Sequence, residues 1–191
     1  MINSFSTYLD QYGSLSEEAQ LSVARISHPT HLPGNHEILK QGNTLKSIYL
    51  ILSGSARMYY YHDGREITNQ FFFEGEVIAD MESIYSGKRS NYTIQLLEDC
   101  SLIEMRYSDL EKLFQQFHDL EAIGRKLAIA CYLEENQRNR SYQKNTAKGR
   151  YFDLLKTYPD ILNRVNLGHI SSYIGVTQVQ LSRIRSKIAA F

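Results

Sequence analysis

The chain has 191 residues, 42% of them hydrophobic, which is enough to bury a core in one domain or two small ones. Its two cysteines, Cys100 and Cys131, lie outside any C-x-x-C spacing, which argues against a disulfide framework, a zinc ribbon and a cysteine-ligated iron–sulfur cluster. The sequence has no run of eighteen apolar residues and no cationic leader at residues 1–4. We therefore expect a cytoplasmic protein without a membrane partner.

The net charge of zero hides an uneven distribution of charge along the chain. Residues 1–137 carry 11 Lys/Arg and 19 Asp/Glu, whereas residues 138–191 carry 10 Lys/Arg and only Asp153 and Asp160. A basic C-terminal module is typical of proteins that bind polyanions, although a solvated basic face gives the same composition. The change in charge predicts a domain boundary near residue 137.

The first hundred residues are predicted to contain a short helical region followed by a β domain. Residues 14–18 offer an N-cap for a helix that Pro29 and Pro33 would end. Runs rich in β-branched and aromatic residues follow at 47–52, 56–61, 67–73 and 92–96. Asp63-Gly64 between two of these runs predicts a two-residue hairpin. Short strands at this spacing predict a β-barrel or jelly-roll sandwich over about residues 32–106.

After residue 108 the hydrophobic spacing becomes helical. The pattern predicts a helix over about residues 108–137 that either pairs with a second copy of the chain or packs on its own β domain. Gly124 within it indicates a close backbone approach or a break. The positions that follow this a/d heptad track are Leu113, Phe117, Leu120, Gly124, Leu127, Cys131 and Glu134.

A polar segment separates this helix from the basic module. Residues 136–145 indicate a hinge or a fraying helix end, where a rotation of the C-terminal module would take place. Asn145 or Thr146 can cap a further helix that ends at Tyr158-Pro159.

Residues 167–184 carry the strongest chemical signal, because they match a helix-turn-helix. That motif needs apolar residues on both helices, a small residue where the helices cross and a left-handed residue at the turn. Ser171 is the small residue, Gly175 takes the turn, and Thr177 with Gln180 predicts a capping box at the start of the second helix. The expected apolar residues are Ile170, Ile174, Val176, Leu181, Ile184 and Ile188.

The opposite side of the second helix is predicted to enter a major groove. Arg183 can form a bidentate pair with a guanine, whereas Arg185, Lys187 and His169 on the flanks suit phosphates. The full set of expected DNA-binding residues is His169, Thr177, Gln178, Val179, Ser182, Arg183, Arg185, Ser186 and Lys187.

The order of these parts resembles the Crp/Fnr family of transcription regulators over nearly the whole chain. Residues 49–54 resemble the family's barrel strand that ends in glycine, and residues 170–177 with 181–185 resemble the subgroup found in Bacteroidetes. The resemblance implies an α+β fold with a cyclic-nucleotide-binding-like sensor domain and dimerisation helix (1–137) and a DNA-binding domain (138–191). It also implies a homodimer on a pseudo-palindromic operator, with half-sites about 34–36 Å apart, and makes RNA polymerase a candidate partner.

The resemblance leaves the effector open. Gly75-Glu76 resembles the family's glycine–glutamate pair, whose glutamate holds the ribose hydroxyl. The arginine–serine pair that holds the cyclic phosphate should follow ten residues later, yet Arg89-Ser90 comes thirteen residues after Glu76. A buried cyclic phosphate needs a charge-assisted partner, so a cyclic nucleotide, another small effector and no effector all remain alternatives.

Two further points concern specificity and function class. Cyclic-AMP-binding members carry an arginine and a glutamate where this chain has Gln178 and Val179, so a different operator sequence is expected. The sequence lacks H-x-H and G-x-S-x-G motifs, and its histidine cluster (His28, His31 and His36) straddles prolines, so neither a metal site nor an enzyme is expected. The alternatives are a cyclic-nucleotide-binding module acting on a protein partner and a small barrel enzyme.

Overall fold

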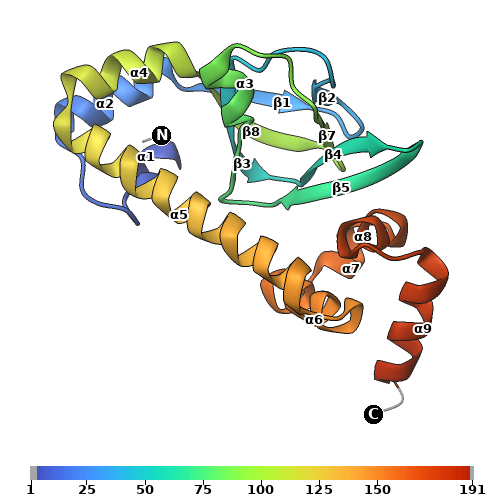
Figure 1. The fold of residues 1–191 in the computed structure, drawn as a ribbon. Helices are drawn as coiled ribbons and strands as arrows, with labels where there is room; N and C mark the ends of the chain where they lie inside the picture. The colour runs from blue at the N-terminus through green and yellow to red at the C-terminus, as the bar shows by residue number, and fades with distance from the viewer. Residues whose placement is uncertain (1–3, 190–191) are drawn as a thin grey trace.

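The computed structural model describes residues 4–189. Residues 1–3, which belong to the segment for which the sequence predicts no cationic leader, lie outside the described part. Helices α1 (Ser4–Leu9) and α2 (Glu17–Ile26) precede a β domain, which is followed by a long helix and a group of shorter ones (Figure 1). The strands are β1 (His28–Leu32), β2 (Glu37–Leu39), β3 (Ser47–Ser53), β4 (Ala56–His62), β5 (Arg65–Phe72), β6 (Val77–Ile78), β7 (Thr93–Leu96) and β8 (Cys100–Arg106). The later helices are α3 (Met81–Ser86), α4 (Tyr107–Gln116), α5 (His118–Lys144), α6 (Ala147–Thr157), α7 (Ile161–Arg164), α8 (Leu167–Ile174) and α9 (Gln178–Ala189).

The strands form two antiparallel four-stranded sheets with the orders β1-β8-β3-β6 and β2-β7-β4-β5. Apolar side chains from both sheets, including Ile51, Ile94 and Leu102, form the core of the sandwich. Asp63 and Gly64 join β4 to β5 with φ of 49° and 72°, as a type I′ turn requires. The predicted jelly-roll-like β domain in an α+β chain is confirmed.

The N-terminal helices pack against the outside of the β domain. Ser16 caps α2, because its hydroxyl accepts a hydrogen bond from the Ala19 N–H at 3.4 Å. The helix ends before Pro29, which lies in β1. α1, α2, α4 and the start of α5 share a second core with Ile103 and Met105 of β8.

The helix predicted over 108–137 is two helices that meet at Phe117. Leu113, Phe117 and Leu120 pack into the chain's own core, so this half of the heptad track follows the alternative of packing on its own domain. A Cβ at Gly124 would lie 2.8 Å from two ring carbons of Phe114. Gly124 therefore permits a close approach of α4 to α5 within one chain.

The polar segment 136–145 forms the last part of α5, so the predicted helix end is present and the predicted hinge stays a prediction. α5 runs without interruption to Lys144 and passes through the predicted boundary at residue 137. The break comes at Asn145, and Thr146 caps α6 by accepting a hydrogen bond from the Gly149 N–H at 3.2 Å. Polar composition alone did not end this helix earlier, and its last turn is held to α6, because Ser141 donates a hydrogen bond to Asp153 at 2.7 Å.

The C-terminal helices form a small core that includes two side chains from the β domain. Phe71 and Phe73 pack with residues of α6 to α9, among them Tyr151, Ile170 and Leu181. α8 lies next to β5, and α9 lies on the side away from the sandwich (Figure 1). No helix among residues 4–189 is long and apolar enough to cross a bilayer.

Candidate DNA-binding site and effector region

The helix-turn-helix is built by local caps at both helices. Asn166 caps α8 by accepting a hydrogen bond from the His169 N–H at 2.9 Å. Gly175 ends α8 in the left-handed conformation, with φ of 72°. The Thr177 N–H donates to Gln180 Oε1 at 2.9 Å, and the Gln180 N–H donates to Thr177 Oγ1 at 3.2 Å. The predicted turn and capping box are therefore present.

The inner face of the motif matches the sequence pattern. Ile170, Ile174 and Leu181 are 0% exposed. Ser171 is buried at the crossing and donates its hydroxyl to the Gly168 carbonyl at 2.8 Å. Val176 and Ile184 pack against this core, whereas the side chain of Ile188 lies outside the described part of the structure.

The outer face of α9 is free, as expected. Val179 is 62% exposed, and Arg183 makes no hydrogen bond or ion pair with any residue that the structure describes. Gln178 leans over the start of α8, because a Cβ at Gly168 would lie 2.8 Å from its Nε2 atom. The exposed residues of the expected set are Thr177, Gln178, Val179, Ser182, Arg183, Ser186 and Lys187, with Arg185 half-buried.

His169 lies apart from this free face. It is half-buried near Arg57, which pairs with Glu66 and hydrogen-bonds Gln95 at 2.8 Å. Burial, assisted by the charge of Arg57, lowers the pKa of His169 to about 4. In this arrangement the imidazole is neutral at pH 7, so it can offer a phosphate a hydrogen bond but no charge.

Ser172 of α8 attaches the motif to the free edge of the second sheet. β5 is an edge strand, and Ser172 Oγ accepts a hydrogen bond from the Thr68 N–H at 2.8 Å and donates one to the Glu66 carbonyl at 2.7 Å. One hydroxyl thus satisfies two backbone groups that an edge strand otherwise leaves to solvent.

Arg164 at the end of α7 makes a second attachment. Its Nη1 and Nη2 atoms donate to the two carboxylate oxygens of Glu74 at 2.8 and 2.7 Å, and its Nε donates to Glu98 at 3.1 Å. The guanidinium also lies 5.1 Å from the ring centre of Phe73. The hydrogen bonds from Arg164 lower the pKa of Glu74 to about 2.

Glu76 makes the third attachment, which differs from the role the resemblance implies. Its carboxylate accepts hydrogen bonds from the Phe73 N–H at 2.9 Å and the Tyr158 hydroxyl at 3.0 Å. Burial raises the pKa of this carboxyl, partly offset by these two donors. The carboxylate expected to hold a ribose is therefore already engaged by the helix α6 end.

The other residues implied for a cyclic nucleotide do not join Glu76. Gly75 has φ of 80° and donates its N–H to the Ile51 carbonyl, so its glycine is explained by the turn. Arg89 is exposed and has no hydrogen bond or ion pair with any described residue. Ser90 is buried and interacts with the backbone of Tyr92. Among these residues only Glu76 therefore has a partner that competes with a nucleotide, whereas Arg89, the cation that a cyclic phosphate would need, is exposed.

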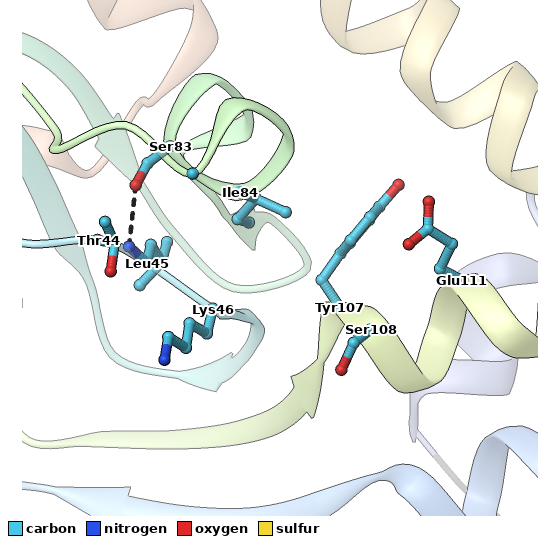
Figure 2. Close-up of a pocket in the computed structure, with 9 residues that line it drawn as sticks. Thr44, Leu45, Lys46, Ser83, Ile84, Tyr107, Ser108 and Glu111 are labelled. Carbon is cyan, nitrogen blue, oxygen red and sulfur yellow. Dashed lines mark hydrogen bonds between the residues drawn. The ribbon is translucent and has the colours of Figure 1, made fainter.

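Two cavities lie elsewhere. One of about 540 Å³ separates Arg65, Glu66 and Ile67 of β5 from the turn of the helix-turn-helix. The other, of about 320 Å³, opens between α3 and α4, where Ser83 Oγ accepts the Leu45 N–H at 3.0 Å (Figure 2). Its lining residues are Thr44, Leu45, Lys46, Ser83, Ile84, Gly87, Tyr107, Ser108 and Glu111, so Gly75, Glu76, Arg89 and Ser90 belong to neither cavity.

The second half of α5 presents an apolar stripe to solvent. Ile129, Tyr132 and Leu133 are 49%, 66% and 55% exposed. They lie on a different side of the helix from Leu127 and Glu134 of the predicted heptad track. These three residues, hereafter the α5 stripe, form an exposed apolar surface that the heptad pattern did not include.

Sequence reasoning missed the attachments of the helix-turn-helix to the sheet. Arg164, Glu74, Glu98 and Ser172 are far apart in the chain, and no spacing rule relates them. The one available signal was the pair Phe71 and Phe73 at the end of a strand, which does not reveal that its partners lie in α6 to α9.

Comparisons with known proteins agree with this architecture. The family model of the cyclic nucleotide-binding domain matches residues 29–117. The CRP-like protein Clp of Xanthomonas euvesicatoria pv. vesicatoria is 20% identical over 182 residues, covering 86% of this chain and 78% of that protein.

Solved structures extend the likeness to both halves of the chain. The c-di-GMP responsive global regulator CLP of Xanthomonas campestris has a TM-score of 0.68 at 19% identity and covers 92% of each chain. A transcriptional regulator of the crp/fnr family from Eubacterium rectale has a TM-score of 0.72 at 16% identity, covering 96% of this chain and 88% of that one. At these identities the two structures show a shared fold.

Proposed function

From its likeness to CRP-like and crp/fnr proteins, we propose that the chain is a regulator of the Crp/Fnr family that binds a pseudo-palindromic operator as a homodimer and regulates transcription there. A specific likeness to the Bacteroidetes subgroup stays a prediction, as does a contact with RNA polymerase. The effector stays open between a cyclic nucleotide, another small molecule and none; the hydrogen bond of Glu76 to Tyr158 disfavours the first, because it occupies the carboxylate implied for the ribose.

The observation that carries the proposal is the capped helix α9 with its unpaired outer face. Gln178, Val179 and Arg183 are exposed on one helix whose start is fixed by Thr177 and Gln180. A rigid helix of this kind can place an arginine fork against the O6 and N7 atoms of guanine. We propose Arg183 as the principal base-reading residue and Lys187 as a phosphate contact, in the part of the chain with 10 Lys/Arg against two Asp.

The homodimer would form along the α5 stripe. Apolar side chains exposed at helical spacing are the usual seam of a two-helix contact. Leu133→Asp should shift the protein to monomer in sedimentation velocity. Asn43→Asp is the matched control, because it adds the same charge at an exposed residue outside α5. A dimer that survives Leu133→Asp would rule out this surface.

Selection of bound DNA from a random duplex library tests the whole proposal. The expected result is a two-fold symmetric site with half-sites one helical turn apart, about 34–36 Å. Recovery of no enriched sequence at low salt would instead favour the alternative in which the chain acts on a protein partner. A single, asymmetric half-site would contradict the homodimer but not DNA binding.

A further inference from the structure

Helices α6 to α9, hereafter the DNA-reading domain, are attached to the β domain on one side by three sets of hydrogen bonds. The outer face of α9, on the other side, takes no part in them. Residues 73–76, hereafter the docking loop, supply Glu74 to Arg164 and Glu76 to Tyr158. Glu98 adds a second carboxylate on Arg164, and the edge of β5 binds Ser172. The helical partners in these bonds, Tyr158, Arg164 and Ser172, lie in α7, in α8 or directly after α6. None of them lies on the outer face of α9.

Each attachment alone would be weak, but together they define an orientation. A bidentate arginine–carboxylate pair fixes both distance and direction, because the planar fork accepts only one relative placement of the two groups. The Tyr158 ring packs on Phe73 at a tilt of 40° with ring centres 4.6 Å apart, and Phe71 is 1% exposed within the core of the DNA-reading domain. Undocking would therefore expose apolar rings and take the donors of Arg164 and Tyr158 away from three carboxylates, each of which keeps one donor from the β domain.

The docked orientation leaves the reading surface available. α9 lies on the far side of α8 from β5 (Figure 1). Arg183 and Val179 on it are exposed. DNA binding by a dimer needs its two reading helices held at a fixed separation, which a loosely tethered domain cannot provide. A domain fastened on one side and free on the other is suited to this task.

We propose that the docking loop and Glu98 hold Arg164 and Tyr158 so that the DNA-reading domain is set in its binding orientation without a cyclic nucleotide. Glu74, Glu76, Glu98, Tyr158 and Arg164 are positioning residues, since none of them lies on the reading face. The docking itself is independent of the proposed function, which enters only through its consequence for operator binding.

The Thr68 amide reports docking directly. Its N–H is hydrogen-bonded to Ser172 across the interface, whereas the amides of β7 lie in a central strand between β2 and β4. Local opening of the interface should therefore speed exchange at Thr68 and leave β7 unchanged. Hydrogen exchange of the full chain, measured residue by residue by NMR, separates docking from global unfolding.

Two variants remove different attachments. Arg164→Gln removes the fork and its charge, and Tyr158→Phe removes only the hydroxyl while keeping the ring on Phe73. We expect each to speed exchange at Thr68 by about tenfold relative to β7, the size expected for hydrogen bonds to charged groups. Lys156→Gln is the control, because it removes an exposed charge of the same domain that forms no ion pair with any described residue. Exchange at Thr68 that rises no more than at β7 in both variants would overturn the proposal.

Two further measurements complete the test. Addition of 1 mM 3′,5′-cyclic AMP or cyclic GMP should leave Thr68 exchange unchanged, and a change with either would overturn independence from the nucleotide. In DNA binding, Arg164→Gln should lose affinity for a two-half-site operator in proportion to the fraction of undocked molecules, with half-site binding retained. If the wild-type chain binds no DNA while Thr68 still responds to Arg164→Gln, the proposed function fails and the docking stands.

Discussion

α8 and α9 share one small core, yet their surroundings are opposite. α8 lies against β5, with Ser172 bonded to the strand edge and Arg164, just before it, bonded to two glutamates of the β domain. α9 turns Val179 and Arg183 to solvent. The difference teaches that one helix sets how the domain is oriented on the β domain and the other carries the surface proposed to recognise DNA. Substitutions should therefore change orientation and recognition independently.

The largest expected effect comes from the core that joins the two helices. Ile170 is 0% exposed, so Ile170→Ala should lower the free energy of unfolding by about 2–5 kcal/mol, and Ile170→Val by about 0.5–1.5 kcal/mol. Val179→Ala on the free face should change it by no more than about 0.5 kcal/mol. Urea unfolding monitored by circular dichroism measures all three. A large loss in Val179→Ala would mean that α9 is not free.

Recognition should respond to the free face alone. Arg183→Ala is expected to reduce discrimination between the selected operator and a guanine-substituted site by about 1–3 kcal/mol, because the bidentate pair is lost. Its free energy of unfolding should stay within about 0.5 kcal/mol of wild type. Titration of both duplexes by fluorescence anisotropy measures the difference. Equal weakening on operator and random duplex would show that Arg183 contacts phosphate instead of base.

The junction between the helices should give a smaller, mixed effect. Thr177→Ala removes the hydroxyl that accepts the Gln180 N–H, and should lower the free energy of unfolding by about 1 kcal/mol. Thr177→Ser restores the acceptor and should recover most of that loss. Urea unfolding of the three proteins provides the measurement, and equal losses in the alanine and serine variants would indicate that the methyl group, not the cap, matters.

The features that the sequence could predict are those determined by neighbouring residues. The Asp63-Gly64 hairpin, the Ser16 and Thr146 caps, the Gly175 turn and the Thr177–Gln180 box each depend on residues within three or four positions. Backbone conformation and capping are local, so these predictions required no knowledge of tertiary contacts. The same reasoning gave the inner and outer faces of α9.

The features that failed depend on partners far away in the chain. The heptad track left open whether a second copy or the chain's own β domain covers it, and Leu113 and Leu120 pack into their own core. Glu76 matched a family pair by type and position, but Tyr158, 82 residues later, occupies its carboxylate. Segment 136–145 continues α5 to Lys144, and Ser141 and Asn145 there donate hydrogen bonds to Asp153 of α6. The type of a residue predicts what kind of partner it will have, but the partner itself is determined by the tertiary fold.

The smallest expected effect is a pH dependence of stability that arises at Glu74 and Glu76, the carboxylates that attach α6 and α7 to the β domain. The pKa of Glu76 is raised by burial and by Glu134 of α5, and lowered by Phe73 N–H, Tyr158 and Arg138. Because its folded pKa lies above the ordinary value of 4.5, the carboxylate disfavours the folded state at neutral pH, and protonation removes this cost as the pH falls towards 4.5. Glu74 acts in the opposite sense, since its pKa of about 2 means that its stabilisation is lost only as the pH falls from about 4.5 towards 2.

Glu76→Gln separates these two carboxylates. Relative to this variant, wild type should gain stability as the pH falls from 7 to 4.5, and the difference is read from urea unfolding at each pH. Glu74→Gln should differ from wild type in its pH dependence only below about pH 4.5. Since both residues contact α6 or α7 and neither contacts α9, base discrimination by Arg183 should not follow either transition. Parallel stability profiles for wild type and Glu76→Gln between pH 7 and 4.5 would mean that Tyr158 does not bind a buried carboxylate. The attachment of the DNA-reading domain to the β domain would then depend on Arg164 and Ser172 alone.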